Sequence, residues 1–227
     1  QSAGNISGAQ SGIYVLQEGI GSTSVTTQGN IKGISSQGIL IDNTSQRSTG
    51  VMVNQIAGYI EGYSGISATN YGTNSLLSIT TAGDINGTQG NGIHAYNQVM
   101  AGDMVIKQTQ GNIIGDQTGI FAHSLGTGTT QITIEGNVTG LHGDGVFADN
   151  AYGVSQDINI TQSAGTIKGY RQGIALNNYG VGSASLQTAG DVIATTGEGI
   201  FAINDTFAFD LNITQTTGSI EGNTTGI

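Results

Sequence analysis

The chain has 227 residues, of which only 9% are charged, and fifteen acidic against five basic residues give a formal net charge of −10. So few basic side chains exclude a surface for nucleic acid or for anionic membranes, which requires clustered Lys and Arg. The sequence has 39 glycines but no proline and no cysteine, which excludes a proline-rich linker, a disulfide framework and a thiolate metal site. No apolar run approaches the roughly 18 residues of a membrane span, so we expect no membrane insertion.

One short motif recurs along the whole chain, in the form Gly-x-[Ile/Val]-x-Gly followed a few residues later by Gly-[Ile/Val]. Only Ala194 replaces the second glycine of a copy. The leading glycines are Gly4, Gly29, Gly58, Gly83, Gly111, Gly136, Gly165, Gly190 and Gly218. Their spacings of 25, 29, 25, 28, 25, 29, 25 and 28 residues alternate, so the full unit is a pair of 53 to 54 residues. Such self-similarity predicts a stacked-repeat fold with residues 1–227 in a single domain.

Each repeat contains three strand-like pieces, which follow one another in the same order. The first has an inward aliphatic residue between its glycines: Ile6, Ile31, Ile60, Ile85, Ile113, Val138, Ile167, Val192 and Ile220. The second follows Gly-Ile, and its alternation places on one side Ile13, Ile39, Ile66, Ile93, Ile120, Val146, Ile174 and Ile200. The third precedes the next copy of the motif, with inward residues such as Val25, Val53, Ile79, Ile106, Ile132, Ile160, Leu186 and Ile213.

The apolar period is two and β-branched residues dominate, which favours strands over helices. Three strands in every 25 to 29 residues predict one coil of a right-handed parallel β-helix, an all-β solenoid. Eight to nine coils at the ordinary spacing between strands would form a rod about 40 Å long.

Two further regularities support stacking of the coils. Asparagine recurs five residues after the glycine of Gly-Ile, at Asn43, Asn70, Asn97, Asn150, Asn178 and Asn204, with Gln17 and Ser124 as exceptions. Asparagines stacked in this way can form a ladder of amide hydrogen bonds. In every second coil one extra residue separates the third piece from the next motif, and we expect it to form a β-bulge.

The phrases Gly-Asn-Ile-Lys-Gly (29–33), Gly-Ile-Phe-Ala (119–122 and 199–202) and Ile-Asn-Ile-Thr-Gln (158–162) resemble the passenger domains of bacterial autotransporters. The repeat is similar to the passengers found in Bartonella, where an angiogenic member acts on host endothelial cells through a growth-factor receptor. The resemblance implies a virulence factor that is secreted or displayed on the bacterial surface after export across the outer membrane. Because Gly226-Ile227 stop within a repeat, we expect a piece of a longer passenger.

Catalytic chemistry has little support in the sequence. A carbohydrate-active β-helix needs paired carboxylates, or aspartates that hold calcium with a basic residue. Asp84 and Asp191 hold equivalent positions but lie four coils apart, and no Asp-Asp or Asp-x-Asp pair occurs. His94 and His123 fall on adjacent coils, yet no carboxylate clearly completes a zinc site around them. We therefore expect no enzymatic activity, no metal and no cofactor.

The outward face of the second strands carries the most suggestive side chains. On the same face as Tyr14, a candidate partner-binding patch consists of His94, Tyr96, Phe121, His123, Phe147, Asp149 and Phe201. Aromatic residues exposed on neighbouring coils often mark protein contacts, although a loop could cover them or they could be ordinary strand aromatics. Six tyrosines fall near turns without an evident grouping: Tyr59, Tyr63, Tyr71, Tyr152, Tyr170 and Tyr179.

The sequence thus predicts a rod that binds a host cell-surface protein, as a receptor ligand of the angiogenic kind. The alternatives are an adhesin, a structural stalk that displays another domain or, less favoured, a carbohydrate-active β-helix. Neither terminus resembles a polar cap, so unpaired strand edges also predict end-to-end self-association.

Overall fold

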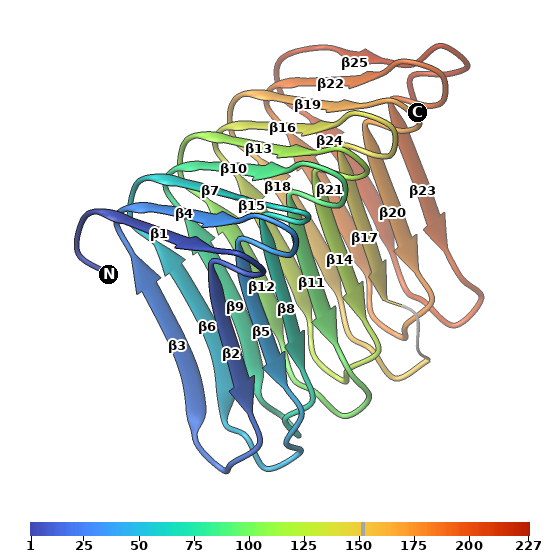
Figure 1. Ribbon diagram of the computed structural model, residues 1–227. Helices are drawn as coiled ribbons and strands as arrows, with labels where there is room; N and C mark the ends of the chain where they lie inside the picture. Colours follow the sequence, from blue (N-terminus) through green and yellow to red (C-terminus); the bar gives the residue numbers. More distant parts are fainter. Residues whose placement is uncertain (151–152) are drawn as a thin grey trace.

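The structure is a computed structural model that describes residues 1–150 and 153–227. These residues form strands and turns without any helix, so none of them belongs to a helix that could cross a membrane. The strands stack in three parallel sheets, each formed by one strand per coil, which confirms the predicted parallel β-helix (Figure 1). Tyr152, one of the tyrosines expected near turns, lies outside the described residues.

The strands of sheet A are the Gly-x-Ile-x-Gly motifs themselves: β1 (Asn5–Gly8), β4 (Asn30–Gly33), β7 (Tyr59–Gly62), β10 (Asp84–Gly87), β13 (Asn112–Gly115), β16 (Asn137–Gly140), β19 (Thr166–Gly169), β22 (Asp191–Ala194) and β25 (Ile220–Glu221). Sheet B contains the strands that follow Gly-Ile: β2 (Ile13–Gln17), β5 (Ile39–Asn43), β8 (Ile66–Asn70), β11 (Ile93–Asn97), β14 (Ile120–Ser124), β17 (Val146–Asn150), β20 (Ile174–Asn178) and β23 (Ile200–Asn204). Sheet C completes each coil: β3 (Ser22–Thr27), β6 (Gly50–Gln55), β9 (Leu76–Thr81), β12 (Met104–Gln108), β15 (Thr130–Ile134), β18 (Ile158–Gln162), β21 (Ala184–Thr188) and β24 (Leu211–Gln215).

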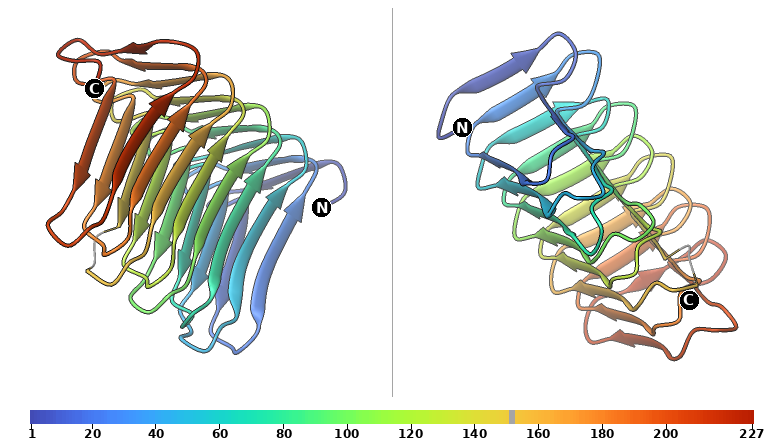
Figure 2. Two further views of the ribbon diagram at one scale, coloured as in Figure 1. Left: turned by 180° about the vertical axis from the view of Figure 1, so that it is seen from behind. Right: turned by 90° about the horizontal axis from the view of Figure 1, so that it is seen from below.

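Sheet A closes one edge of the rod, while the long strands of sheets B and C face each other across the interior (Figures 1 and 2). The chain runs from β1 through β2 to β3 and then enters the next coil with a right-handed turn (Figure 1). This hand is the one that right-twisted parallel strands almost always adopt when they are joined by crossovers.

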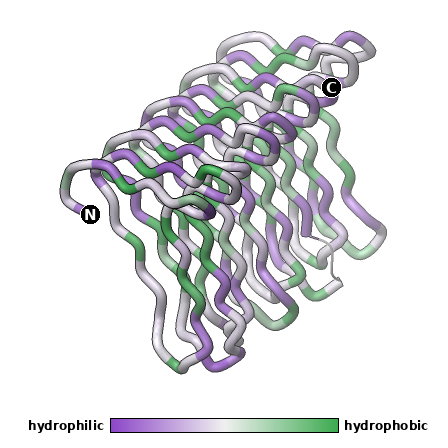
Figure 3. Tube along the Cα trace, viewed as in Figure 1, coloured by the Kyte–Doolittle hydropathy of each residue, from purple (hydrophilic) through white to green (hydrophobic). Residues whose placement is uncertain are grey.

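The core is a set of aliphatic ladders along the axis of the rod. Ile60, Ile85 and Ile113 pair in direct register in sheet A, and all three are at most 1% exposed. Ile66, Ile93 and Ile120 do the same in sheet B, with the small Ala68, Ala95 and Ala122 two residues further on. Hydropathy alternates along each strand, as Figure 3 shows, because alternate side chains point into the core. At the ends of the rod the equivalent Ile6, Ile13 and Ile220 are only partly buried, whereas Ile200 is still 1% exposed.

The expected asparagine ladder exists, with an interruption. The side-chain amide of Asn43 donates to Asn70 at 2.8 Å, and that of Asn70 donates to Asn97 at 3.3 Å. Ser124 then breaks the series, and Asn150 instead accepts a hydrogen bond from Thr130 and donates to the carbonyl of Gln156. All of these buried amides therefore find partners inside the corner between sheets B and C.

The expected β-bulge in alternate coils is wrong, because sheet C keeps an uninterrupted one-to-one register. The extra residue lies after the strand, in the corner that leads to sheet A. There Gly111 adopts φ +84°, as do three equivalent glycines with φ from +78° to +92°, a conformation that side chains disfavour. The amide of Gln108 donates to the carbonyls of Gly111 at 2.8 Å and of Asn137 at 3.1 Å.

An acidic or amide side chain of the preceding coil completes each wide corner. Asp84 Oδ1 accepts the backbone N–H of Asn112 at 2.8 Å, a donor that follows the positive-φ glycine. Asn30 and Asn137 act in the same way one pair of coils earlier and later, and Asp191 does so two pairs later. The two-coil repeat of the sequence is therefore a repeat of this corner, in which glycine, glutamine and Asp or Asn act together.

Candidate functional site

The outer face of sheet B carries two rows of side chains that cross successive coils in direct register. Row one consists of Tyr14, Leu40, Ser67, His94, Phe121, Phe147, Ala175 and Phe201. Row two consists of Leu16, Asp42, Thr69, Tyr96, His123, Asp149, Asn177 and Ile203. Unlike the inward ladders, these rows change residue type from coil to coil, and aromatic rings gather on β11, β14 and β17.

The aromatic rings pack against one another along the rod. Phe121 stacks on Phe147 with a centroid distance of 4.9 Å and an interplanar angle of 8°. His94 meets Phe121 edge-on at 5.0 Å, while His123 stacks on Tyr96 at 5.0 Å. All of these rings are half-buried and remain partly exposed to solvent. They form a rigid surface, because each ring restricts the rotamers of the next.

His123 is also oriented by a carboxylate. Its Nδ1 lies 3.0 Å from Oδ2 of Asp149, whose residue is 9% exposed. Partial burial lowers the pKa of His94, and the charge of His123 lowers it further. Burial raises the pKa of Tyr96, and the nearby Tyr71 adds to that shift. The aromatic surface therefore carries a neutral His94 and an uncharged Tyr96 at neutral pH.

A hollow of about 570 Å³ lies on the N-terminal side of these rings, and we call it the first hollow. Its lining comes from both rows and from the turns that follow them: Asp42, Thr44, Thr69, Tyr71, His94, Tyr96, Gln98, Phe121 and His123. The hollow exists because the side chains of row two are shortest at Thr69, which lies between Asp42 and the larger ring of Tyr96.

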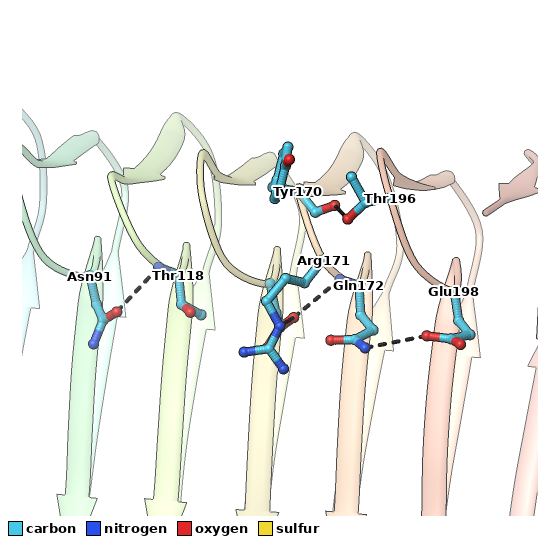
Figure 4. A network of polar contacts seen from close by, with 8 residues as sticks. Asn91, Thr118, Tyr170, Arg171, Gln172, Thr196 and Glu198 are labelled. Carbon is cyan, nitrogen blue, oxygen red and sulfur yellow. Dashed lines mark hydrogen bonds and ion pairs between the residues drawn. The ribbon is translucent and has the colours of Figure 1, made fainter. Parts of the chain in front are cut away.

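A second hollow of about 370 Å³ lies where sheet A turns into sheet B, and Phe121 and His94 separate it from the first. Its polar wall is a ledge formed by the residue that precedes each Gly-Ile. Figure 4 shows this ledge, in which Asn91 accepts the backbone N–H of Thr118 at 3.2 Å and Gln172 donates to Glu198 at 3.3 Å. Asp144 occupies the equivalent position on the coil between Thr118 and Gln172.

Asp144 is a buried carboxylate, 3% exposed, on this ledge. Its Oδ1 accepts the backbone N–H of Gln172 at 3.1 Å and lies 3.8 Å from Nε of Arg171. Burial raises the pKa of Asp144, against the lowering effects of Arg171 and of the Gln172 N–H. The second hollow thus combines an acid, a base and two phenyl rings, and its charges already neutralise each other.

The structure brings together six of the seven expected site residues: His94, Tyr96, Phe121, His123, Phe147 and Asp149. Phe201 stands apart, because Ala175 lies between it and Phe147 in row one. Tyr14 is separated from His94 by Leu40 and Ser67, so the packed rings do not extend along this face to Tyr14.

Sequence analysis missed Asp42, Thr69 and Tyr71 as members of the site. Asp42 and Thr69 share a register with Tyr96, so aligning the repeats was enough to find them. Tyr71 shows no evident grouping in the sequence, because a turn residue cannot be assigned to a hollow before the path of the turn is known.

Residues considered for catalysis or for metal have other roles. Oδ1 of Asp84 and Oδ1 of Asp191 each accept a backbone N–H group of the next coil, which gives both carboxylates a structural role in the corner. In the part of the chain that the structure describes, no group of three His, Cys, Asp or Glu side chains could hold a metal ion. His94 and His123 point instead into aromatic contacts.

A smaller polar cluster lies on the outer face of sheet A. Lys32 pairs with Glu61 at 2.6 Å, which is the main cause of the lowered pKa of that carboxyl, and Glu61 accepts the Tyr59 hydroxyl at 2.7 Å. Burial and this hydrogen bond raise the pKa of Tyr59 to about 12. The three groups satisfy one another, so we regard the cluster as a surface ion-pair network.

Comparisons with protein-family models, with curated proteins and with solved structures return no significant match. We therefore infer the function from the fold and from the geometry of sheet B.

Proposed function

We propose that this chain is a non-catalytic binding rod, displayed or secreted by a bacterium, which binds a host cell-surface protein through the outer face of sheet B. The observation that carries the proposal is the packed aromatic surface of β11, β14 and β17, beside a hollow of about 570 Å³. Rigid aromatic rings next to a concavity are the usual energetic centre of a protein interface.

The architecture supports the same proposal. A solenoid presents an extended surface, and its core ladders hold that surface rigid, so little conformational entropy is lost on binding. A net charge of −10 favours association with a basic protein surface. The resemblance of the repeat to autotransporter passengers supports export and a host receptor as partner, with a growth-factor receptor and an angiogenic effect as the narrowest form of the proposal.

The test is binding of the fluorescently labelled chain to host endothelial cells. We expect saturable binding that unlabelled chain displaces and that Phe121→Ser with Phe147→Ser reduces at least tenfold, because both rings lie in the packed surface.

The matched control is Tyr14→Ser with Leu16→Ser, which removes two more exposed side chains, at 56% and 48%, from the same sheet. This control should bind like the unchanged chain. Non-saturable binding of the unchanged chain, or equal loss in both double variants, would contradict the proposed surface.

A further inference from the structure

The first hollow has opposite chemistry on its two sides. Asp42 provides a carboxylate on the N-terminal side, Tyr96 provides an aromatic ring two coils further on, and Tyr71 provides a second ring from the turn after β8, on the coil between them. Asp42 and Tyr96 belong to the same row, two coils apart, which places their Cα atoms about 10 Å from each other at the ordinary strand spacing. Thr69 lies between them as a low floor, so a flat group that enters the hollow meets a charge and a ring together.

The carboxylate of Asp42 is available to such a group. Within residues 1–150 and 153–227, its side chain forms no ion pair and no hydrogen bond, and no Lys or Arg lines the hollow. The second hollow differs in this respect, because Arg171 already lies beside Asp144. The negative charge of Asp42 in the first hollow is therefore uncompensated, whereas Arg171 compensates that of Asp144 in the second. Only the first hollow attracts a further positive charge.

We propose that the first hollow receives an arginine side chain of the bound protein, with the guanidinium between the carboxylate of Asp42 and the aromatic rings of Tyr96 and Tyr71. A guanidinium is planar, stacks on aromatic faces and forms forked hydrogen bonds with a carboxylate, so it matches both sides of the hollow. This inference rests on the proposed protein-binding role and names the side chain that this role requires from the partner.

The surroundings favour arginine over a neutral or an acidic group. Burial lowers the pKa of His94, which disfavours a positive charge there, and His123, the other histidine of the lining, is paired with the carboxylate of Asp149. The whole chain carries a net charge of −10, which attracts a basic segment from a distance. Thr69 and Gln98 add hydroxyl and amide oxygens that can accept the remaining N–H groups of a guanidinium.

The experiment is a nuclear magnetic resonance titration of the isotope-labelled chain with N-acetyl-arginine amide. The matched probe is N-acetyl-citrulline amide, which has nearly the same shape without the charge. We expect binding on the order of millimolar for arginine amide, as for a single anchored side chain. The shifts should be confined to residues around Thr69, Tyr71 and Tyr96, and citrulline amide should bind about fivefold or more weakly.

Two variants with equal charge separate the hollow from the general acidity. Asp42→Asn removes the carboxylate of the hollow and should weaken arginine amide about fivefold. Glu135→Gln removes one charge from an exposed position between sheets C and A, and it should leave the affinity unchanged. Equal binding of citrulline amide, shifts outside the hollow, or no effect of Asp42→Asn would overturn the proposal.

The remaining outcomes distinguish other occupants and the proposed function itself. Tighter binding of tetramethylammonium than of arginine amide would overturn the assignment to protein arginine in favour of a choline headgroup. If Asp42→Asn binds host cells as well as the unchanged chain does, while Phe121→Ser with Phe147→Ser abolishes binding, the arginine proposal fails and the proposed function stands. If the unchanged chain shows no saturable cell binding, the proposed function itself fails.

Discussion

The inward and outward faces of sheet B follow opposite rules, although they alternate along the same strands. The first inward position of each strand holds Ile or Val on every coil, as in Ile66, Ile93 and Ile120. Outward positions on these coils change from Ser67 to His94 to Phe121. A ladder needs identical shapes to stack without gaps, whereas a binding surface needs a particular shape at one place. In this solenoid, the outward positions at which the residue type departs from the repeat therefore indicate the candidate site.

The largest expected effect comes from breaking an inward ladder. Ile113→Ala removes a fully buried side chain at the centre of sheet A, and it should lower the free energy of unfolding by about 2–5 kcal/mol. The matched change is Ile114→Ala, one residue later in the same strand, where the side chain points outward and is 36% exposed. Chemical denaturation should show at most about 0.5 kcal/mol for this control. Equal losses would contradict the ladder.

The next effect concerns the corner that sets the two-coil repeat. Gly111→Ala should destabilise the fold, because φ is +84° and the new Cβ would lie 2.5 Å from the carbonyl oxygen of Gly83. Gly4→Ala shares the conformation, at +85°, but its Cβ would meet nothing within 4 Å, so it should cost only about 1–2 kcal/mol.

Thermal and denaturant unfolding of both glycine variants gives the difference directly. We expect Gly111→Ala to exceed Gly4→Ala by about 1 kcal/mol or more, since backbone must move to accept the methyl group. A smaller loss for Gly111→Ala than for Gly4→Ala would show that stacking of the corners does not restrict this position.

The next prediction concerns the buried carboxylate of Asp144, on the ledge beside the site. Because its folded pKa is raised, the folded state holds the proton more tightly than the unfolded state. Stability contributed by this group is therefore present below the ordinary value of 3.8 and is lost as the pH rises through the raised pKa. Asp144→Asn keeps an oxygen that can accept the Gln172 N–H, as Asn91 accepts the N–H of Thr118. The variant should be more stable than the unchanged chain, and this difference should be larger at pH 7 than at pH 4.

Denaturation midpoints across that pH range, for the unchanged chain and for Asp144→Asn, measure this effect. The two curves should converge at low pH and separate as the pH rises. Parallel curves would mean that Arg171 fully compensates the buried charge.

The smallest expected effect is at His94. Its folded pKa lies below the ordinary value of 6.5, so the unfolded state binds the proton more readily. The stability from this group is present above pH 6.5 and declines as the pH falls towards the lowered pKa. A histidine titration by nuclear magnetic resonance should place the His94 midpoint below 6.5. A midpoint at or above that value would show that the ring of Phe121 does not exclude water from it.

Most of the fold could be predicted from the sequence, because the ladders leave a direct signal. The period of two and the recurring glycines identified the inward residues, the stacked asparagines and the parallel coils. The corner could not be predicted in the same way. The extra residue before Gly58 and Gly111 is visible in the spacing, but only the register of sheet C shows that it lies outside the strand.

The rows of side chains in the candidate site could be predicted from the sequence, but the hollow could not. Row membership follows from the repeat, so His94, Phe121 and Phe147 could be placed side by side. The first hollow depends on a short side chain between longer ones, and Thr69 has no feature in the sequence that would mark it as the floor of a hollow. Similarly, the position of Tyr71 depends on the path of a turn, which periodicity does not describe.

The most direct test of the central claim is site-specific cross-linking on intact host cells. A photoreactive benzophenone amino acid would replace Ser67, in row one of sheet B, or Ser78, at an outward position of sheet C. We expect position 67 to give a discrete cross-linked host protein that unlabelled chain competes away, and position 78 to give none. Equal yields from both positions, or capture from position 78 alone, would contradict this expectation.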